Sequence, residues 1–356
     1  MATISDYNSN GKGQPIGPAE IRTEGGTRIY LLPVQSFPGH LNNLYLVDDP
    51  DHPFLFDCGT HLSHDQLDTC MDFVRTEFGV KTRLQDLSEV IVSHAHIDHF
   101  GGAGRFRDMG LPIAIHELDA RVLEGFRERL IIASRDVAVF LRRAGMEPAA
   151  VADLVDIYQT EKDYFQDLEP DRRLRNGDRI AGRWPILHVP GHCPGMICIA
   201  IDDVVLTADH LLSRITPAQR PQSITPFTGL ENYLRSLDKL KGWGTFALGL
   251  GAHEAPIRQI EQRIFETQTH HANRLRLVLA ACRERPRNLT EITLHLFPQI
   301  AGFSLLLAQS EVGAHVEYLH ELRYLAIGNI DVVAADYYAA ATYRTIDRTT
   351  DPLGLA

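Results

Sequence analysis

Residues 93–99 read Ser-His-Ala-His-Ile-Asp-His, so three imidazoles and one carboxylate fall within seven consecutive positions. The apolar run Val90-Ile91-Val92 precedes them and is typical of a short buried strand. Irregular backbone beyond the carboxyl end of such a strand can turn several side chains toward one point. Imidazole and carboxylate donors, without a thiolate, suit zinc, iron or manganese. The stretch therefore predicts a metal site, and an exposed histidine-rich loop is the alternative.

The composition indicates an ordinary globular protein. The chain has 356 residues, of which 44% are hydrophobic and 23% charged, enough for one large domain and a smaller one. A formal net charge of −11 argues against a surface built for polyanions. No apolar run approaches the roughly 18 residues of a membrane span, and the amino end lacks the features of a secretion signal. Five scattered cysteines fit a reducing compartment, so we expect a cytoplasmic enzyme without a membrane partner.

The spacing of apolar residues predicts an alternation of strands and helices from residue 27 to residue 255. Residues 1–26 are polar and glycine-rich and predict either an N-terminal tail or a loose edge of the fold. Asn176-Gly177 predicts a tight hairpin within residues 173–180. Helices are expected at residues 63–78, 103–109 and 229–241. Strands are expected at residues 28–34, 43–47, 53–56, 89–93, 112–115, 185–189, 196–201, 204–207 and 245–250.

Two regions stand apart from this alternation. Residues 117–168 predict two or three amphipathic helices, more than a connection between strands needs. They form either a lid or substrate wall over the metal site or an extra packing layer, and both interpretations stay open. From residue 256 onward, helices are expected at 256–285, 288–296 and 311–325, followed by a small hairpin wing at 327–346.

Three further loops carry metal donors directly after predicted strands. Residues 191–195 read Gly-His-Cys-Pro-Gly, residues 206–210 read Leu-Thr-Ala-Asp-His, and residues 249–253 read Gly-Leu-Gly-Ala-His. A zinc-type site that drew on one cluster alone would be incomplete. The three loops are therefore expected to complete the site begun at residues 93–99.

In these motifs and in their order, the chain resembles the metallo-β-lactamase fold metallo-hydrolase superfamily, including its glyoxalase II-like members. The family patterns are His-x-His-x-Asp-His, Gly-His-Thr-Pro-Gly, Gly-Asp and Pro-Gly-His-Gly. Cys193 stands in place of Thr, Ala208 replaces Gly, and the residues around His253 are altered. A strict glyoxalase II is not expected, because that family has a further histidine where Ala95 stands. The resemblance implies an α/β fold, a four-layer αββα sandwich over residues 27–255, with the helical insertion and a small, mainly helical C-terminal domain over residues 256–356.

The resemblance also assigns metal ligands. It implies two divalent cations, with zinc expected first and iron or manganese as alternatives. Asp57 matches an acid that orients ligands rather than binding metal. The implied ligands are His94, His96 and His192 for the first metal, Asp98, His99 and His253 for the second, and Asp209 as a bridge between them.

Four more residues are candidates for lining the substrate site. His210 follows the bridging acid, and a hydrogen-bonded structural role is the alternative. Arg214 could meet an anionic substrate or form a surface ion pair. His116 and His40 stand at predicted strand ends, near the expected mouth of the site.

The implied chemistry is hydrolysis by a hydroxide that bridges the two cations, with Asp98, Asp209 and Asp57 as the catalytic carboxylates. Asp209 could accept the proton of the water. A thiolate departs without an acid whereas an alkoxide needs one, and no dedicated acid is evident, which favours a small thioester or another acyl substrate. A phosphodiesterase or endoribonuclease, and a mononuclear-iron persulfide dioxygenase, are the alternatives.

Residues 256–356 resemble the winged-helix-like tail of a branch that includes β-lactamase-like protein 2, some of whose members are endoribonucleases. From residue 270 onward the chain has eight arginines and no lysine against nine acids. This balance argues against nucleic acid as a partner, because such a tail would need a basic excess. Packing on the metal domain, or formation of a homodimer, is the expected role.

Overall fold

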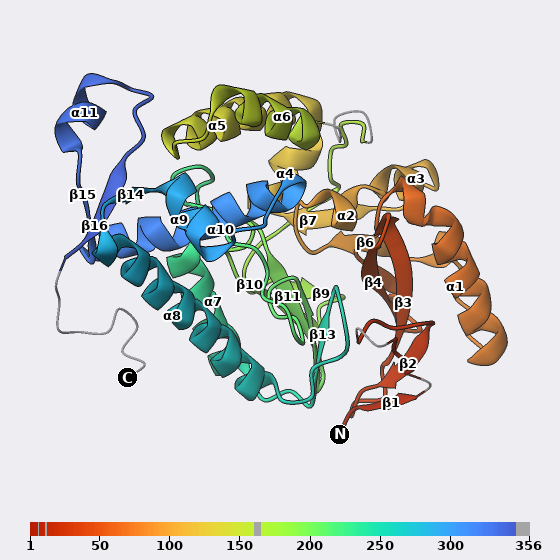
Figure 1. The fold of residues 1–356 in the computed structure, drawn as a ribbon. Helices are drawn as coiled ribbons and strands as arrows, with labels where there is room; N and C mark the ends of the chain where they lie inside the picture. The colour runs from red at the N-terminus through yellow and green to blue at the C-terminus, as the bar shows by residue number, and fades with distance from the viewer. Residues whose placement is uncertain (6, 11–12, 160–164, 347–356) are drawn as a thin grey trace. The chain divides into compact units, whose positions relative to one another are not determined.

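The computed structural model of the protein describes residues 1–5, 7–10, 13–159 and 165–346 (Figure 1). The chain divides into two compact units. The first, which we call the sandwich unit, consists of Met1–Phe126, Asp163–Pro217 and Arg235–Ile264. The second, the helical unit, consists of Arg127–Lys162, Ala218–Leu234 and Phe265–Ala356. Each unit is described separately below.

The larger sheet of the sandwich unit has eight strands in sequence order. The first five are antiparallel neighbours, whereas β5 through β8 run parallel to one another. The strands are β1 (Thr3–Ser5), β2 (Ala19–Arg22), β3 (Arg28–Phe37), β4 (His40–Asp48), β5 (Phe54–Phe56), β6 (Glu89–Val92), β7 (Ile113–His116) and β8 (Arg172–Leu174). Because parallel strands end at the same edge, the loops after β5, β6 and β7 gather there.

The smaller sheet has five strands in the order β13-β12-β11-β10-β9, of which only the pair β12 and β13 is parallel. The strands are β9 (Arg179–Ile180), β10 (Trp184–His188), β11 (Ile197–Ile201), β12 (Val204–Ala208) and β13 (Leu248–Gly251). The two sheets pack face to face. The Tyr45 hydroxyl donates to the Gly251 carbonyl at 2.6 Å, and the Phe54 ring lies 5.6 Å from the Trp184 ring.

Helices cover the outer faces of this pair of sheets. On the larger sheet, α1 (His64–Glu77) packs on β3, while α3 (Ala103–Asp108) and α4 (Glu117–Glu124) pack on β7. On the other side, α7 (Leu230–Trp243) contributes residues 235–243 to the sandwich unit, and its Ser236 hydroxyl donates to the Pro190 carbonyl at 2.7 Å. The result is the four-layer αββα arrangement.

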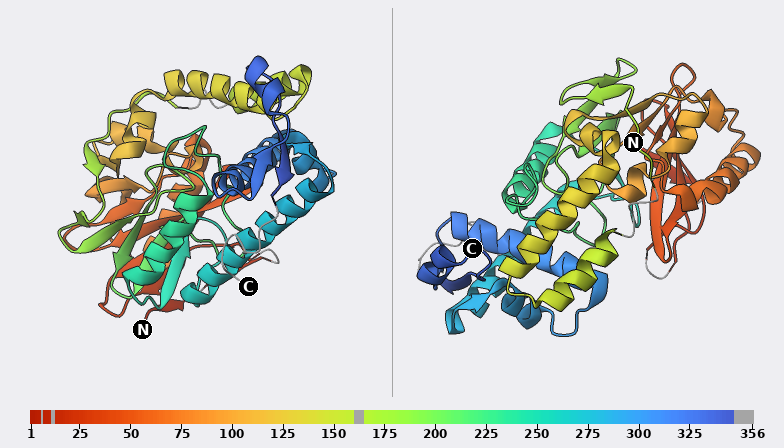
Figure 2. Two further views of the ribbon diagram at one scale, coloured as in Figure 1. Left: turned by 90° about the vertical axis from the view of Figure 1, so that its left-hand side faces the viewer. Right: turned by 90° about the horizontal axis from the view of Figure 1, so that it is seen from above.

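The helical unit contains α5 (Phe126–Arg143), α6 (Pro148–Gln159), α8 (Ile260–Glu284), α9 (Leu289–Leu296), α10 (Gly302–Glu321) and α11 (Ile330–Ala335). The neighbouring helices α5 and α6 (Figure 2, yellow) share one apolar cluster with Leu306 of α10. A second cluster joins α8, α9 and α10, with Leu275, Ile292 and Val312 fully buried. A small sheet completes the unit, with β16 (Thr342–Thr345) paired between β14 (Arg287–Asn288) and β15 (Leu325–Ile327).

Several expectations about local structure are wrong. Residues 1–26 are not all tail, because Ala19 and Ile21 point into the core from β2, which pairs with β3. The hairpin expected at Asn176-Gly177 does not form, because β8 pairs with β7 in the larger sheet whereas β9 pairs with β10 in the smaller one. The last helices also begin elsewhere: α8 begins at Ile260 rather than at Pro256, and α10 begins at Gly302 rather than at residue 311.

The helical insertion and the wing are present. Residues 117–159 form α4, α5 and α6, and β15 and β16 form an antiparallel pair with α11 between them. The contacts group residues 127–162 with the C-terminal helices, where α5 and α6 contribute to a common core. The helices α5 and α6 of the insertion therefore share a core with the C-terminal helix α10. Among the described residues, no helix has both the length and the apolar character that crossing a bilayer requires.

Candidate metal centre

Three imidazoles meet at the loop after β6. His94 Nε2 lies 3.0 Å from His96 Nδ1, and His192 Nε2 lies 3.0 Å from the same His96 nitrogen. Two nitrogens bound about 2.1 Å from one zinc-type ion would lie about 3.0 Å apart at a right angle and about 3.4 Å apart at the tetrahedral angle. The three nitrogens therefore have the spacing of ligands to one cation. His94 is fully buried, and His192 is almost so.

The remaining predicted donors form a second group beside the first. Asp98 Oδ2 lies 3.4 Å from His99 Nε2 and 3.8 Å from His253 Nε2. Asp209 Oδ1 lies 3.2 Å from His253 Nε2. Asp209 Oδ2 lies 3.7 Å from His99 Nε2 and 3.6 Å from His192 Nε2 of the first group. The structure thus brings together all seven side chains, and Asp209 stands between the two groups.

Asp57 supports both groups from behind. Its Oδ2 accepts hydrogen bonds from His99 Nδ1 at 2.8 Å and from the Ser93 hydroxyl at 2.9 Å, and its Oδ1 accepts one from the Ser93 backbone N–H at 2.7 Å. The Ser93 hydroxyl also lies 2.9 Å from His94 Nδ1. Asp57 has a φ of 65°, in the left-handed region that few residues other than glycine adopt. Such strain is maintained only where the surroundings require it. Here it directs the carboxylate at His99 and at Ser93, whose hydroxyl contacts His94.

The charges of the site call for bound cations. Burial disfavours the charged form of His99, yet Asp98, Asp57 and Asp209 together raise its pKa well above the ordinary value. Burial likewise opposes the charge on His253, but Asp209 and Asp98 raise its pKa to about 9. His99 Nε2 is buried and makes no hydrogen bond. The three carboxylates therefore attract either protons on these imidazoles or metal ions between them, and the donor set fits divalent ions such as zinc.

Comparison with known proteins identifies the family. A family model described as the metallo-beta-lactamase superfamily matches residues 38–245. The chain belongs to the metallo-β-lactamase superfamily. A curated relative, the probable metallo-hydrolase YqjP of Bacillus subtilis (strain 168), is 23% identical over 250 residues, which are 67% of this chain and 77% of the relative.

Two solved structures of the superfamily resemble most of the chain. A metallo-beta-lactamase family protein from Thermus thermophilus has 27% identity and a TM-score of 0.70, with 89% of this chain and 98% of that chain covered. A beta-lactamase domain protein from Burkholderia ambifaria has 23% identity and a TM-score of 0.71, with 91% and 96% covered. The predicted fold and superfamily are confirmed, and so is the prediction of a metal-dependent hydrolase. The assignment to one branch of the superfamily stays a prediction.

Two departures from the superfamily motifs have structural consequences. Ala208, which stands where a glycine is usual, has a φ of 44° immediately before Asp209, so a non-glycine residue takes the left-handed conformation there. Cys193, which replaces a threonine, places its Sγ 3.3 Å from His96 Nε2. This thiol therefore contacts the second ring nitrogen of His96, while His96 Nδ1 faces His94 and His192, and it stands close enough to the three imidazoles to be a further donor.

Asp119 is a component of the site that no sequence motif indicates. It lies on α4 and is fully buried. Its Oδ2 accepts the backbone N–H of Ala95 and its Oδ1 accepts that of Gly195, each at 2.8 Å. Any side chain at Gly195 would collide with it, because a Cβ there would lie 2.6 Å from the Asp119 carboxyl carbon. One carboxylate thus connects the loop of His94 and His96 to the loop of His192.

The four candidate substrate residues lie in different surroundings. His40 is half-exposed at the start of β4, with its Nε2 3.0 Å from Asp98 Oδ2 and its ring 4.7 Å from that of His253. His116 instead caps α4 by accepting the Leu118 N–H, and its ring stacks on His188 at 4.0 Å. His40 thus contacts the second donor group directly.

The other two candidates differ in exposure. His210 is fully buried, and burial lowers its pKa to about 3, which fits the structural alternative. Arg214 is exposed, and its backbone N–H donates to Glu254 Oε2 at 2.8 Å. Its guanidinium lies beside Gly13.

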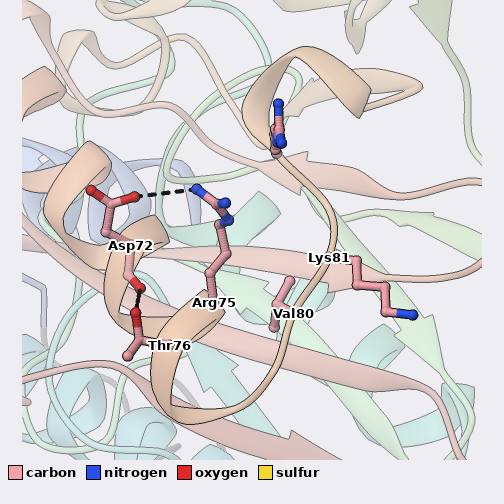
Figure 3. Close-up of a pocket in the computed structure, with 6 residues that line it drawn as sticks. Asp72, Arg75, Thr76, Val80 and Lys81 are labelled. Atoms are coloured by element: carbon pink, nitrogen blue, oxygen red, sulfur yellow. Dashed lines mark hydrogen bonds and ion pairs between the residues drawn. The ribbon is translucent and has the colours of Figure 1, made fainter.

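The sandwich unit also has an open hollow formed by the end of α1 and the following loop (Figure 3). Its lining includes Asp72 and Arg75, which form an exposed ion pair at 3.4 Å, and Lys81. None of its lining residues belongs to the donor groups. A solvated ion pair of this kind contributes little, so we assign this hollow no function.

Proposed function

We propose that the chain is a dinuclear metal-dependent hydrolase that acts on a thioester or another small acyl compound. The position of Asp209 supports two cations most directly. Its Oδ2 lies 3.6 Å from a nitrogen of the first donor group and 3.7 Å from a nitrogen of the second. A carboxylate in that place can serve two cations at once.

Each donor group would hold one cation. When bound, the pair of cations supplies an acidified water nucleophile and polarises the substrate carbonyl. Zinc is the first expectation, and iron or manganese are alternatives, because imidazole and carboxylate donors accept each of them. The proposed ligands are His94, His96 and His192 in the first group, Asp98, His99 and His253 in the second, and Asp209 in both.

The chain's own residues would orient the reactants and move the proton. Burial disfavours the charge on Asp209, but His253 and His99 hold its pKa well below the ordinary value, so it is ionised, as a metal ligand must be, and a proton that it took from water would be passed on rather than retained. Asp57 fixes the orientation of His99 through the bond at Nδ1. The half-exposed His40 marks the side of the second group that faces solvent, and we propose that substrate approaches there.

The leaving group favours thioesters over simple esters. A thiolate, with a pKa near 8.5, departs without protonation, whereas an alkoxide requires an acid. The proposed machinery assigns its carboxylates to metal binding, to orientation and, at Asp209, to the proton of the water, and it assigns none of them to protonating a leaving group. A substrate whose leaving group needs no acid therefore fits it best.

The test combines metal analysis with a substrate panel. Protein purified without added metal is analysed for bound elements and then assayed on thioesters, lactones, phosphodiesters and RNA. We expect about two ions per chain and the highest kcat/KM on a thioester. Asp209→Asn should lower both metal content and activity, whereas Asp156→Asn, which changes an exposed carboxylate on α6, should leave both unchanged.

Three results would contradict the proposal. Metal-dependent RNA cleavage that is lost in Asp209→Asn, with no thioesterase activity, would indicate a nuclease. One iron per chain together with oxygen consumption on persulfides would indicate the dioxygenase. One ion per chain in an enzyme that is active on thioesters would refute the dinuclear site but not the thioesterase activity.

A further inference from the structure

The helical unit contains a second cluster of metal-binding side chains, separate from the centre of the sandwich unit. His271 lies on α8, and Glu311 and His315 lie one turn apart on α10 (Figure 1). His271 Nδ1 lies 3.1 Å from His315 Nε2 and 3.9 Å from Glu311 Oε1. Both imidazoles are fully buried. Buried polar groups in a helical core need partners, so this triad requires an explanation.

The orientation of His315 leaves one nitrogen for a ligand. Its Nδ1 donates to the Glu311 backbone carbonyl at 2.7 Å, so its Nε2 carries the lone pair that faces His271 Nδ1. A histidine that binds metal usually donates its other ring nitrogen to a carbonyl or carboxylate in this way. The separation of 3.1 Å between the two facing nitrogens is close to the 3.0 Å found between His94 Nε2 and His96 Nδ1.

Glu311 supplies the negative charge of the triad. Its Oε2 accepts the backbone N–H of Gln219 at 2.7 Å, and its Oε1 is the oxygen nearer to His271. Burial lowers the pKa of His315 to about 4 and holds the pKa of His271 well below its ordinary value, so both imidazoles are neutral near pH 7. Two neutral imidazoles and one carboxylate form a donor set that zinc accepts in proteins.

We propose that His271, Glu311 and His315 bind one zinc-type divalent cation that connects α8 to α10. The ion would balance the charge of Glu311 within the core of the unit. Arg274 lies near both imidazoles and opposes a cation there, but its guanidinium is held over the Phe297 ring at 4.7 Å. The competing arrangement is a hydrogen bond from His271 Nδ1 to His315 Nε2 without metal, and experiment separates the two.

The first experiment removes the centre of the sandwich unit and leaves the triad intact. A His94→Ala/His96→Ala/His99→Ala/Asp209→Asn/His253→Ala variant of the full chain, which removes ligands of both donor groups, is loaded with Zn²⁺, passed over a desalting column and analysed for metal. We expect about one ion per chain, and Co²⁺ in its place should give the visible absorption bands of a site with nitrogen and oxygen ligands. Absence of both metal and Co²⁺ bands in folded protein would overturn the proposal.

The second experiment locates that ion. In the same background, His271→Gln and Glu311→Gln should each lower Zn²⁺ affinity at least tenfold. The exposed neighbour His270→Gln should leave it unchanged. Because Glu311→Gln keeps the size of the side chain, it serves if His271→Gln does not fold. Equal retention of metal in all three of these variants would place the ion elsewhere and overturn the assignment.

Discussion

The Asp119 carboxylate accepts the backbone N–H of Ala95, between His94 and His96, at 2.8 Å. The same carboxylate accepts the Gly195 N–H, three residues beyond His192, at the same distance. The three imidazoles of the first group are therefore positioned partly by a residue on α4 that binds the backbone of their two loops. Burial raises the pKa of Asp119 to about 6. The two N–H donors nevertheless require a group that accepts at both oxygens, which is the ionised carboxylate.

Replacing Asp119 by Asn should destabilise this junction. The new amide NH₂ would face one of the two N–H donors, leaving that donor without a partner, at a cost of about 1–3 kcal/mol in the free energy of unfolding. We also expect weaker retention of metal, because both ligand loops lose support. Urea unfolding and metal analysis provide the measurement. Glu117→Gln, an exposed change on the same helix, should cost little, and equal effects of the two would contradict this role.

Asp57→Asn should weaken metal binding rather than unfold the protein. Asn tolerates the left-handed φ of 65° at this position, so the backbone gains no new strain. His99 Nδ1 would lose its charged acceptor, and loss of such an orienting bond typically costs 10- to 100-fold in metal affinity. Competition with a chromophoric chelator measures the change. Asp72→Asn, in the exposed ion pair of Figure 3, is the control, and an affinity equal to the control would count against the assignment.

The sequence was most informative where chemistry is concentrated in short segments. The stretch at residues 93–99 follows a buried strand of β-branched residues, and both features are local, so the strand, the loop and the donors could be predicted together. The donors at residues 192, 209 and 253 could be found for the same reason, since each directly follows a strand. The side chain of Asp119 escaped prediction because it acts on backbone groups 24 and 76 residues away.

Non-local pairing explains the errors in the fold. Asn176-Gly177 has the composition of a two-residue hairpin turn, and Gly177 does adopt a φ of 86°. The strands on its two sides nevertheless join different sheets, which no local signal reveals. The early start of α10 escapes prediction because its first turns are apolar on exposed and buried sides alike, with Phe303 and Leu307 exposed and Leu306 buried, so they show little of the periodicity from which helices are predicted.

Acidification should destabilise the sandwich unit through His116. Burial, followed by repulsion from His188, lowers the pKa of His116 to about 3 in the folded protein. In the unfolded chain this histidine binds a proton near pH 6.5, so between these pH values only the unfolded chain is protonated there. The contribution of the neutral His116 to the free energy of unfolding is complete above pH 6.5. It is lost progressively as the pH falls toward 3, by about 1.4 kcal/mol per pH unit.

The variant His116→Asn isolates this contribution. Asn is a favoured cap for α4 and does not titrate, so it keeps the helix start while removing the proton. Between pH 7 and pH 5 we expect the wild type to lose up to about 2 kcal/mol more stability than the variant. Urea unfolding at both pH values measures the difference. Parallel losses in the two proteins would show that His116 titrates normally.

The start of α9 should be sensitive to a single polar substitution. The Asn288 side chain accepts the Glu291 N–H at 2.8 Å, and the Glu291 carboxylate accepts the Asn288 N–H at 2.9 Å, which completes a capping box. Gly145 has no room for a Cβ beside the Asn288 amide, so the cap is also enclosed by the turn after α5.

Asn288→Ala should therefore cost about 0.5–2 kcal/mol of local stability, and Asn288→Ser, which keeps an acceptor, should recover most of it. Because the chain has two units, one global melting temperature would mix their responses, so hydrogen exchange of the α9 amides is the appropriate measurement. Exposed Asn273→Ala on α8 is the control. Faster exchange confined to α9 in the Asn288→Ala variant, but not in the Asn288→Ser variant, is the expected result. Uniform acceleration across the unit in both would show that Asn288 acts through packing against Gly145 rather than as a helix cap.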